Sequence, residues 1–162
     1  MRRSAILAMT LLAGCASATH YQKSDAIWGP IQKIGIFPFL SAHDDPVRRE
    51  LATKLFATEL RKLGRFEVVE LPAPPPAPFG PNFQAAARKG GVDAYIEGTV
   101  GDMWEILVDL KLTDAASGDI LWSSRYHRGA GPEFSFRFNT PQQQLQRIFE
   151  ITLRDLNTIS RS

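Results

Sequence analysis

Apolar and polar positions recur with different periods along the chain, and each period predicts an element. Residues 33–39 (KIGIFPF) form a compact apolar run with β-branched and aromatic side chains, which is typical of a buried strand. Residues 66–71 (FEVVEL) and 93–103 have the same character. Over residues 104–114 apolar and polar positions alternate, which predicts a strand with one polar face. Residues 120–128 follow a glycine-containing turn, so we expect them to complete a hairpin.

Two further segments carry the start and stop signals of helices. Asp45 followed by Pro46 predicts an N-cap with proline at the first helical position, and Gly64 ends this helix. Asn82 is expected to cap a short helix over residues 83–89, which stops at two glycines.

The last helix begins at a capping box, Thr140-Pro141-Gln142-Gln143, and runs to about residue 159. Both long helices show an apolar stripe that repeats every three or four residues, which indicates packing on one side. In the first helix the stripe is Val47, Leu51, Leu55, Leu60 and Leu63. In the last helix it is Leu145, Ile148, Phe149, Thr152, Leu156 and Ile159.

The predicted elements follow one another in the order β-α-β-α-β-β-β-α. A strand, a helix and a strand in succession indicate a parallel pair joined by a crossover, whereas the hairpin is antiparallel. The sequence therefore predicts a single α/β (α+β) domain with a mixed β-sheet and helices packed on the sheet. Residues 129–139 carry Phe134, Phe136 and Phe138 at period two, which fits either core packing or an exposed edge strand.

The N-terminus has the layout of an export signal. Arg2 and Arg3 precede an apolar run over residues 5–13, which is too short for a membrane-spanning helix of about 20 residues. The next motif, Leu12-Ala13-Gly14-Cys15, resembles the lipobox of bacterial lipoproteins. The resemblance implies cleavage between Gly14 and Cys15, a diacylglycerol group on the Cys15 thiol, and an acyl chain such as palmitate on the new amine.

This interpretation divides the chain into a signal peptide (1–14), a lipidated N-terminus with a short tether (15–32) and a periplasmic domain (33–162). Fully extended, the tether spans roughly 60 Å. In lipoprotein sorting an aspartate after the cysteine favours the inner membrane. The residue here is Ala16, so the resemblance implies an outer-membrane lipoprotein that faces the periplasm.

Signal cleavage also changes the charge of the protein. The chain has 19 Lys and Arg against 17 Asp and Glu. The signal peptide carries Arg2 and Arg3 and no acid, so the mature chain has 17 of each sign and a formal charge of zero. No long-range field remains to attract nucleic acid. Cys15 is the only cysteine, so no disulfide can form within the chain.

The candidate catalytic groups form no recognisable motif. The chain has no G-x-S-x-G elbow, no P-loop and no G-x-G-x-x-G fingerprint. The histidines are His20, His43 and His127, and the acids near the predicted strands are Asp93, Glu97, Asp102, Glu105 and Asp109. Acids on adjacent strands can face each other as in a glycosidase, but such a placement also arises by chance. We expect no enzyme, no metal site and no cofactor besides the acyl chains on Cys15.

Three features suit partner binding better. The first is the proline-rich connector over residues 72–81, with Pro74, Pro75 and Pro76, which is either a docking motif or a rigid loop. The second is Trp104, which can anchor a contact. The third is the row of Phe134, Phe136 and Phe138, because an exposed strand edge can pair with another chain.

Several segments together resemble a group of bacterial envelope proteins: KIGIFPF, LRKLGRFEVVE, DAYIEGTV and VDLKLTDAASGDILWSS. The group contains the curli secretion lipoproteins, the lipoprotein activators of penicillin-binding proteins, and the N-terminal domain of the translocation protein TolB. The resemblance covers residues 33 to about 125. It implies an α/β domain with a mixed sheet that binds protein partners and is not catalytic. The chain lacks the long membrane-spanning hairpins of the first family and the propeller of TolB.

The resulting hypothesis is a non-enzymatic outer-membrane lipoprotein that binds or scaffolds partners in cell-envelope assembly or transport. Its expected partners are the membrane, through the lipid anchor, and envelope proteins of unknown identity, with self-association left open. One alternative is an activator or regulator of a peptidoglycan synthase. Another is a small periplasmic hydrolase, whose mark would be a concave site that holds two or more of the acids with His43 or His127.

Overall fold

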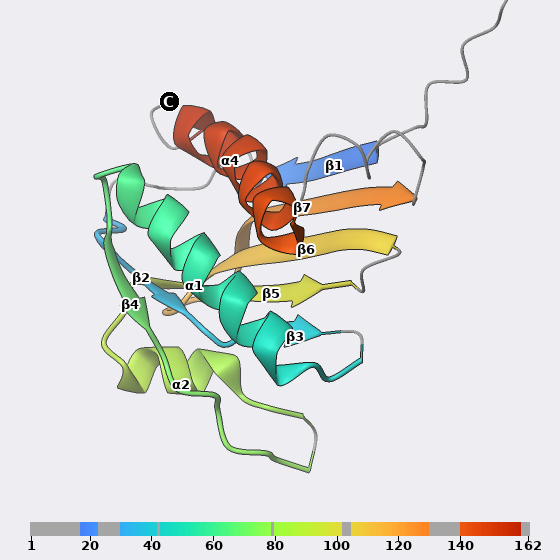
Figure 1. Cartoon of the computed structure of the whole chain (residues 1–162). Helices are drawn as coiled ribbons and strands as arrows, with labels where there is room; N and C mark the ends of the chain where they lie inside the picture. The colour runs from blue at the N-terminus through green and yellow to red at the C-terminus, as the bar shows by residue number, and fades with distance from the viewer. Residues whose placement is uncertain are drawn as a thin grey trace, which may run out of the picture.

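A computed structural model describes residues 17–22, 30–41, 43–78, 80–101, 105–129 and 140–159. One mixed β-sheet forms the centre, and the two long helices α1 and α4 lie side by side across one of its faces (Figure 1). The short helix α2 covers part of the opposite face. The predicted fold class is confirmed.

The sheet has an antiparallel half and a parallel half. Its strands run in the spatial order β1-β7-β6-β5-β2-β4, with β3 paired to β5 beyond the end of β2. Strand β2 is parallel to both β4 and β5, whereas β5, β6, β7 and β1 form successive antiparallel pairs. The strands are β1 (Ser17–Gln22), β2 (Lys33–Ile36), β3 (Leu40–Ser41), β4 (Glu67–Glu70), β5 (Ala94–Val100), β6 (Glu105–Asp114) and β7 (Ile120–Gly129).

The helices begin where the sequence predicts their caps. They are α1 (Pro46–Lys62), α2 (Phe83–Lys89) and α4 (Pro141–Ile159). The Asp45 carboxylate accepts hydrogen bonds from the backbone N–H groups of Val47 and Arg48 at 3.0 and 3.2 Å. The Asn82 side chain accepts from the Ala85 N–H at 2.9 Å, and the Thr140 hydroxyl from the Gln143 N–H at 3.2 Å. Each cap satisfies donors that the first helical turn leaves free.

The main core lies between the sheet and the pair α1–α4. Its centre is a cluster of three rings, in which Phe39, Phe56 and Phe149 have centroids 5.2 to 6.1 Å apart. The Thr53 hydroxyl fixes the chain after β2 to α1, since it accepts from the Phe39 N–H at 2.9 Å and donates to the Arg49 carbonyl at 2.7 Å. The predicted stripe of α4 is buried at Leu145, Ile148, Phe149, Thr152 and Leu156.

A second, smaller core lies under α2 on the opposite face of the sheet. It contains Phe37, Leu71, Ala87, Val92, Tyr95 and Ala115. These residues come from the ends of β2 and β4, from α2, and from the start of β5 and the end of β6. Helix α2 is only seven residues long, so it leaves the remainder of this face without a covering helix among the described residues.

Residues 17–22 differ from the sequence prediction. They were expected to belong to a tether over residues 15–32, but they form β1, which pairs with β7 from Ser17 opposite His127 to Gln22 opposite Trp122. The segment SATHYQ lacks alternating apolar positions. It forms a strand because β7 offers an unpaired edge to its backbone, and a pairing so distant in sequence leaves no local signal.

A smaller difference concerns Val47, and a bulge affects Ile120. Val47 was assigned to the apolar stripe of the first helix but is 74% exposed, because the buried side of α1 is formed by Ala52, Phe56, Ala57 and Leu60. Ile120 is exposed although Trp122 is buried, because a β-bulge between β6 and β7 shifts the register there.

Candidate functional site

On the side of the sheet that carries α2, the part beyond α2 bears a row of polar and charged side chains, which we call the open face: Glu97, Thr99, Asp109, Lys111 and Arg125. Strand register places Glu97 opposite Lys111, and Thr99 opposite Asp109, which in turn lies opposite Arg125. Alternation along each strand aims these side chains away from the main core. The polar face that the sequence predicts for residues 104–114 is therefore confirmed.

Both acids of the open face are held in ion pairs across strands. Lys111 Nζ lies 2.5 Å from Glu97 Oε2. Arg125 Nε donates to Asp109 Oδ2 at 2.9 Å, and a second nitrogen of the same guanidinium bonds the same oxygen. Opposite charges directly across an antiparallel pair stabilise the sheet.

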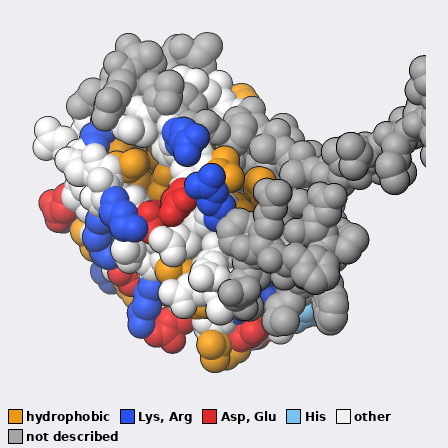
Figure 2. Space-filling view, turned by 45° about the horizontal axis from the view of Figure 1, so that its top comes forward, with side chains coloured by type: hydrophobic (Ala, Val, Ile, Leu, Met, Phe, Trp, Pro, Cys, Tyr) orange, Lys and Arg blue, Asp and Glu red, His pale blue; other side chains and the backbone are white. Residues whose placement is uncertain are grey.

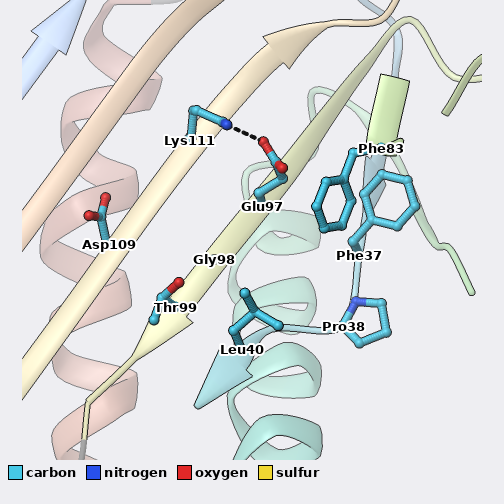
Figure 3. A pocket seen from close by; sticks show the side chains of 9 residues that line it. All are labelled: Phe37, Pro38, Leu40, Phe83, Glu97, Gly98, Thr99, Asp109 and Lys111. Atoms are coloured by element: carbon cyan, nitrogen blue, oxygen red, sulfur yellow. Dashed lines mark ion pairs between the residues drawn. The ribbon is translucent and has the colours of Figure 1, made fainter. Parts of the chain in front are cut away.

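A pocket of about 260 Å³ lies at the border of the open face and α2 (Figure 3). Lys111 and Glu97 point toward each other on one side, while Phe37 and Phe83 form the wall on the other. Pro38 and Leu40 close the pocket where the chain passes from β2 to β3. Its volume lies just below the range of about 300–1,000 Å³ that is usual for small-molecule sites.

The aromatic wall is built on Phe37. Its ring lies 5.0 Å from the ring of Phe83 and 5.7 Å from that of Tyr95, in edge-on geometry in both cases. Burial, and secondarily the negative charge of Glu97, raises the pKa of the Tyr95 phenol. Tyr95 is therefore neutral near pH 7 and acts there as a packing residue.

Asp93, His43 and His127 do not line this pocket, and Asp102 lies outside the described residues. The Asp93 carboxylate accepts from the backbone N–H groups of Gln32 and Lys33, both at 2.9 Å, so it fastens the start of β2. His43 is exposed after β3 and His127 is half-buried near the end of β7, and neither lines the pocket. Within the described ranges no three of the His, Cys, Asp and Glu side chains are grouped to hold a metal ion.

Of the predicted partner-binding residues, only the three prolines lie in the described part of the chain. Pro75 and Pro76 are exposed on the connector between β4 and α2, and Pro74 is half-buried. The other predicted site residues lie outside the described residues: Gly14, Cys15, Trp104, Phe134, Phe136 and Phe138. The sequence prediction missed Phe37, Phe83 and Leu40 as pocket residues, because no sequence pattern shows that β3 and α2 flank the same part of β5.

The face that carries α1 and α4 shows acidic and basic side chains interspersed, with no large area of one sign (Figure 2). Ion pairs account for part of this pattern. Lys62 lies 2.6 Å from Glu59, Arg61 3.1 Å from Glu70, and Arg147 3.1 Å from Glu150. Among the described residues on this face, the interspersed charges form no basic patch of the kind that binds nucleic acid.

None of the helices in the described ranges combines the length and the apolar character needed to cross a bilayer.

No protein-family model matches the sequence, and no curated protein matches it. Solved structures do share its fold. PelC from Paraburkholderia phytofirmans, described as a dodecamer, superposes with a TM-score of 0.62 at 17% identity, over 86% of this chain and 95% of that one. A variant of PelC in another crystal form gives 0.63.

TolB from Acinetobacter baumannii superposes with a TM-score of 0.50 at 14% identity, over 85% of this chain and 29% of TolB. The LpoB C-terminal domain from Escherichia coli reaches 0.46 over 60% of this chain, which is too distant to carry an argument. The fold that the sequence resemblance implied is confirmed, and identities this low establish the fold alone.

Proposed function

We propose that this chain is a non-enzymatic lipoprotein that binds or scaffolds protein partners at the periplasmic face of the outer membrane, in envelope assembly or transport. The observation that carries the proposal is the open face: a charged part of the sheet that no helix of the described ranges covers. Its acids and bases are fixed in ion pairs, so it offers a defined pattern for recognition and no reactive group.

The ion pairs argue against the alternative of a hydrolase. A general acid or a nucleophile needs a carboxyl group that can reach the substrate. Glu97 and Asp109 are instead each bound to a cation on the next strand. Neither His43 nor His127 lies beside them at the pocket.

The anchor is proposed from the lipobox at Cys15. Each buried CH₂ of an acyl chain contributes about 0.8 kcal/mol, so three chains hold a protein on a bilayer essentially permanently. Ala16 favours the outer membrane. PelC, which shares the fold over 95% of its length, is a dodecamer, and this supports self-association as part of the proposal, to be measured by the mass of the purified chain in detergent.

The test is a charge exchange on the open face. In the double variant Glu97→Lys with Lys111→Glu, the cross-strand ion pair persists but its polarity is reversed, so the fold is expected to be retained. The matched control is Lys54→Glu with Glu50→Lys, which reverses an exposed pair on α1, on the other side of the molecule. Partners are crosslinked in cells and recovered from detergent extracts by affinity purification.

We expect the wild type and the α1 control to recover the same partners, and the open-face exchange to lose them. Unchanged recovery of partners with the open-face exchange would show that partners do not bind through this surface. If the recovered partner is a peptidoglycan synthase, adding the purified domain to that synthase distinguishes a regulator, which raises its activity, from a scaffold, which does not.

A further inference from the structure

One end of the sheet is set by a single transverse row of residues. Ser17 at the start of β1 lies opposite His127 on β7, which lies opposite Leu107 on β6. The Leu107 carbonyl accepts a hydrogen bond from the Gly101 N–H at 2.7 Å. Val100, the last residue of β5, pairs with Ser41 of β3. We call this end the β1-start end; the start of β1, the heads of β7, β5 and β3, and the start of α1 share it in Figure 1.

The position of β1 limits how far this end can lie from the lipid. Cys15 precedes Ser17 by two residues, and two residues span at most about 7 Å. A tether that began the folded domain at residue 33 would have allowed any orientation. Because β1 is paired with β7 along its whole length, an acylated Cys15 must keep the β1-start end close to the bilayer.

The same end exposes apolar side chains that the core does not use. Val47 on the first turn of α1 is 74% exposed and Leu40 on β3 is 54% exposed. Leu40 precedes and Val47 follows the turn in which the Asp44 N–H donates to the Ser41 carbonyl at 3.1 Å. Only two other large apolar side chains are exposed in the described part of the chain, Tyr21 and Ile120, and Ile120 lies at the opposite end of the hairpin.

Two acids of the described chain at this end, Asp44 and Asp45, have partners within the chain. Asp44 Oδ1 lies 2.9 Å from a guanidinium nitrogen of Arg49. Asp45 accepts from two backbone N–H groups as the N-cap of α1, where the helix dipole favours a negative charge. Neither acid therefore places an unbalanced negative charge against an anionic bilayer.

From this geometry we infer that the β1-start end, with Leu40 and Val47, rests on the lipid surface of the membrane that holds the anchor. The inference relies on the proposed acylation of Cys15. It fixes the orientation of the domain. Strands β5, β6 and β7 stand upright on the membrane surface, and the turn of the β6–β7 hairpin, next to Ile120, points into the periplasm. The open face then lies at the side of the molecule, within reach of neighbours on the same membrane.

The test places a nitroxide label at single introduced cysteines in the full, acylated chain. Cys15 is the only native cysteine, so after acylation the introduced thiol alone reacts with the label. The variants are Val47→Cys and Leu40→Cys, and the matched control is Ile120→Cys. Ile120 is also an exposed apolar residue, but it lies seven residues along β7 from His127 at the β1-start end, a distance of roughly 24 Å. The chain is reconstituted in vesicles of phosphatidylethanolamine and phosphatidylglycerol, and the collision rates of each label with oxygen and with a water-soluble nickel complex are measured.

We expect the labels at Val47 and Leu40 to favour oxygen over nickel by several-fold relative to the same protein in solution, and the Ile120 label to be unchanged. With acylation of Cys15 confirmed by mass spectrometry, water-like values at Val47 and Leu40, or a lipid-like value at Ile120, would overturn the orientation and leave the proposed function intact. A Cys15 without acyl chains would overturn both.

Discussion

Glu59 is the one buried carboxylate in the described part of the chain, and it joins the two long helices. Its Oε1 atom lies 2.6 Å from Lys62 Nζ on α1 and accepts a hydrogen bond from Gln146 Nε2 on α4 at 3.3 Å. A buried carboxylate is tolerated only with such partners. The pairing of α1 with α4 thus depends on a polar contact as well as on the ring cluster of the core.

Replacing Glu59 with alanine leaves the Gln146 amide without its acceptor at the helix interface. We expect a loss of about 1–3 kcal/mol in the free energy of unfolding, measured by urea denaturation. The control is Lys54→Ala, which removes the cation of an exposed ion pair on the same helix and is expected to cost less than about 1 kcal/mol. Equal losses for the two variants would contradict this role of Glu59.

Tyr95 makes stability depend on pH in the alkaline range. Burial raises the pKa of its phenol in the folded protein, so the unfolded chain ionises first as the pH rises. The stabilising difference is fully present below the ordinary tyrosine pKa of about 10 and is lost as the pH rises through the folded value.

The variant Tyr95→Phe tests this dependence. Between pH 9 and pH 11 the wild type should lose stability faster than the variant, because only the wild type loses the contribution of Tyr95. The lysines and the other tyrosines titrate in both proteins, so their effects cancel in the comparison. Thermal melts of the pair across this range measure the difference. Parallel curves would show that Tyr95 ionises equally easily in the folded and unfolded chains.

At the scale of elements, β1 is the part of the sheet that connects the fold to the proposed anchor. It covers the outer edge of β7, which otherwise presents unpaired backbone groups along a long strand. At the other edge of the sheet, Arg61 donates to the Val68 carbonyl at 3.4 Å and pairs with Glu70, so a charged side chain protects β4. The two edges are thus protected by different means.

A chain that starts at residue 30 should therefore be less stable than one that starts at residue 16, and should aggregate more readily at high concentration. Both effects follow from the bare edge of β7. Urea midpoints and light scattering of the two proteins measure them. Identical midpoints would mean that β1 adds nothing to the stability of the sheet, and would weaken the case for a fixed anchor position.

The elements differ in how far local sequence determines them. The helix caps at Asp45, Asn82 and Thr140 were predictable because each cap satisfies N–H groups two or three residues away. The β6–β7 hairpin was predictable from its alternation and turn. Strand β1 and the two-residue β3 were not, because their partners on β7 and β5 lie far away in the sequence. The pocket was missed for the same reason.

At the scale of the whole molecule, the face that carries α1 and α4 has no large area of one sign, and many charged groups of the described chain form ion pairs. Such a surface does not by itself bind a bilayer or nucleic acid strongly. We propose that the acyl chains on Cys15 attach the protein to the membrane and that the open face binds protein partners. The site of attachment then determines which partners the protein can meet.

The variant Cys15→Ser tests this central claim most directly, by separating inner-membrane, outer-membrane and soluble fractions of cells. We expect the wild type to be recovered in the outer membrane with acyl chains on Cys15 and to resist washing with high salt. We expect the variant to remain an uncleaved, unacylated precursor that is absent from the outer-membrane fraction. A Cys15→Ser protein that still fractionated with the outer membrane like the wild type would show that Cys15 is not the anchor.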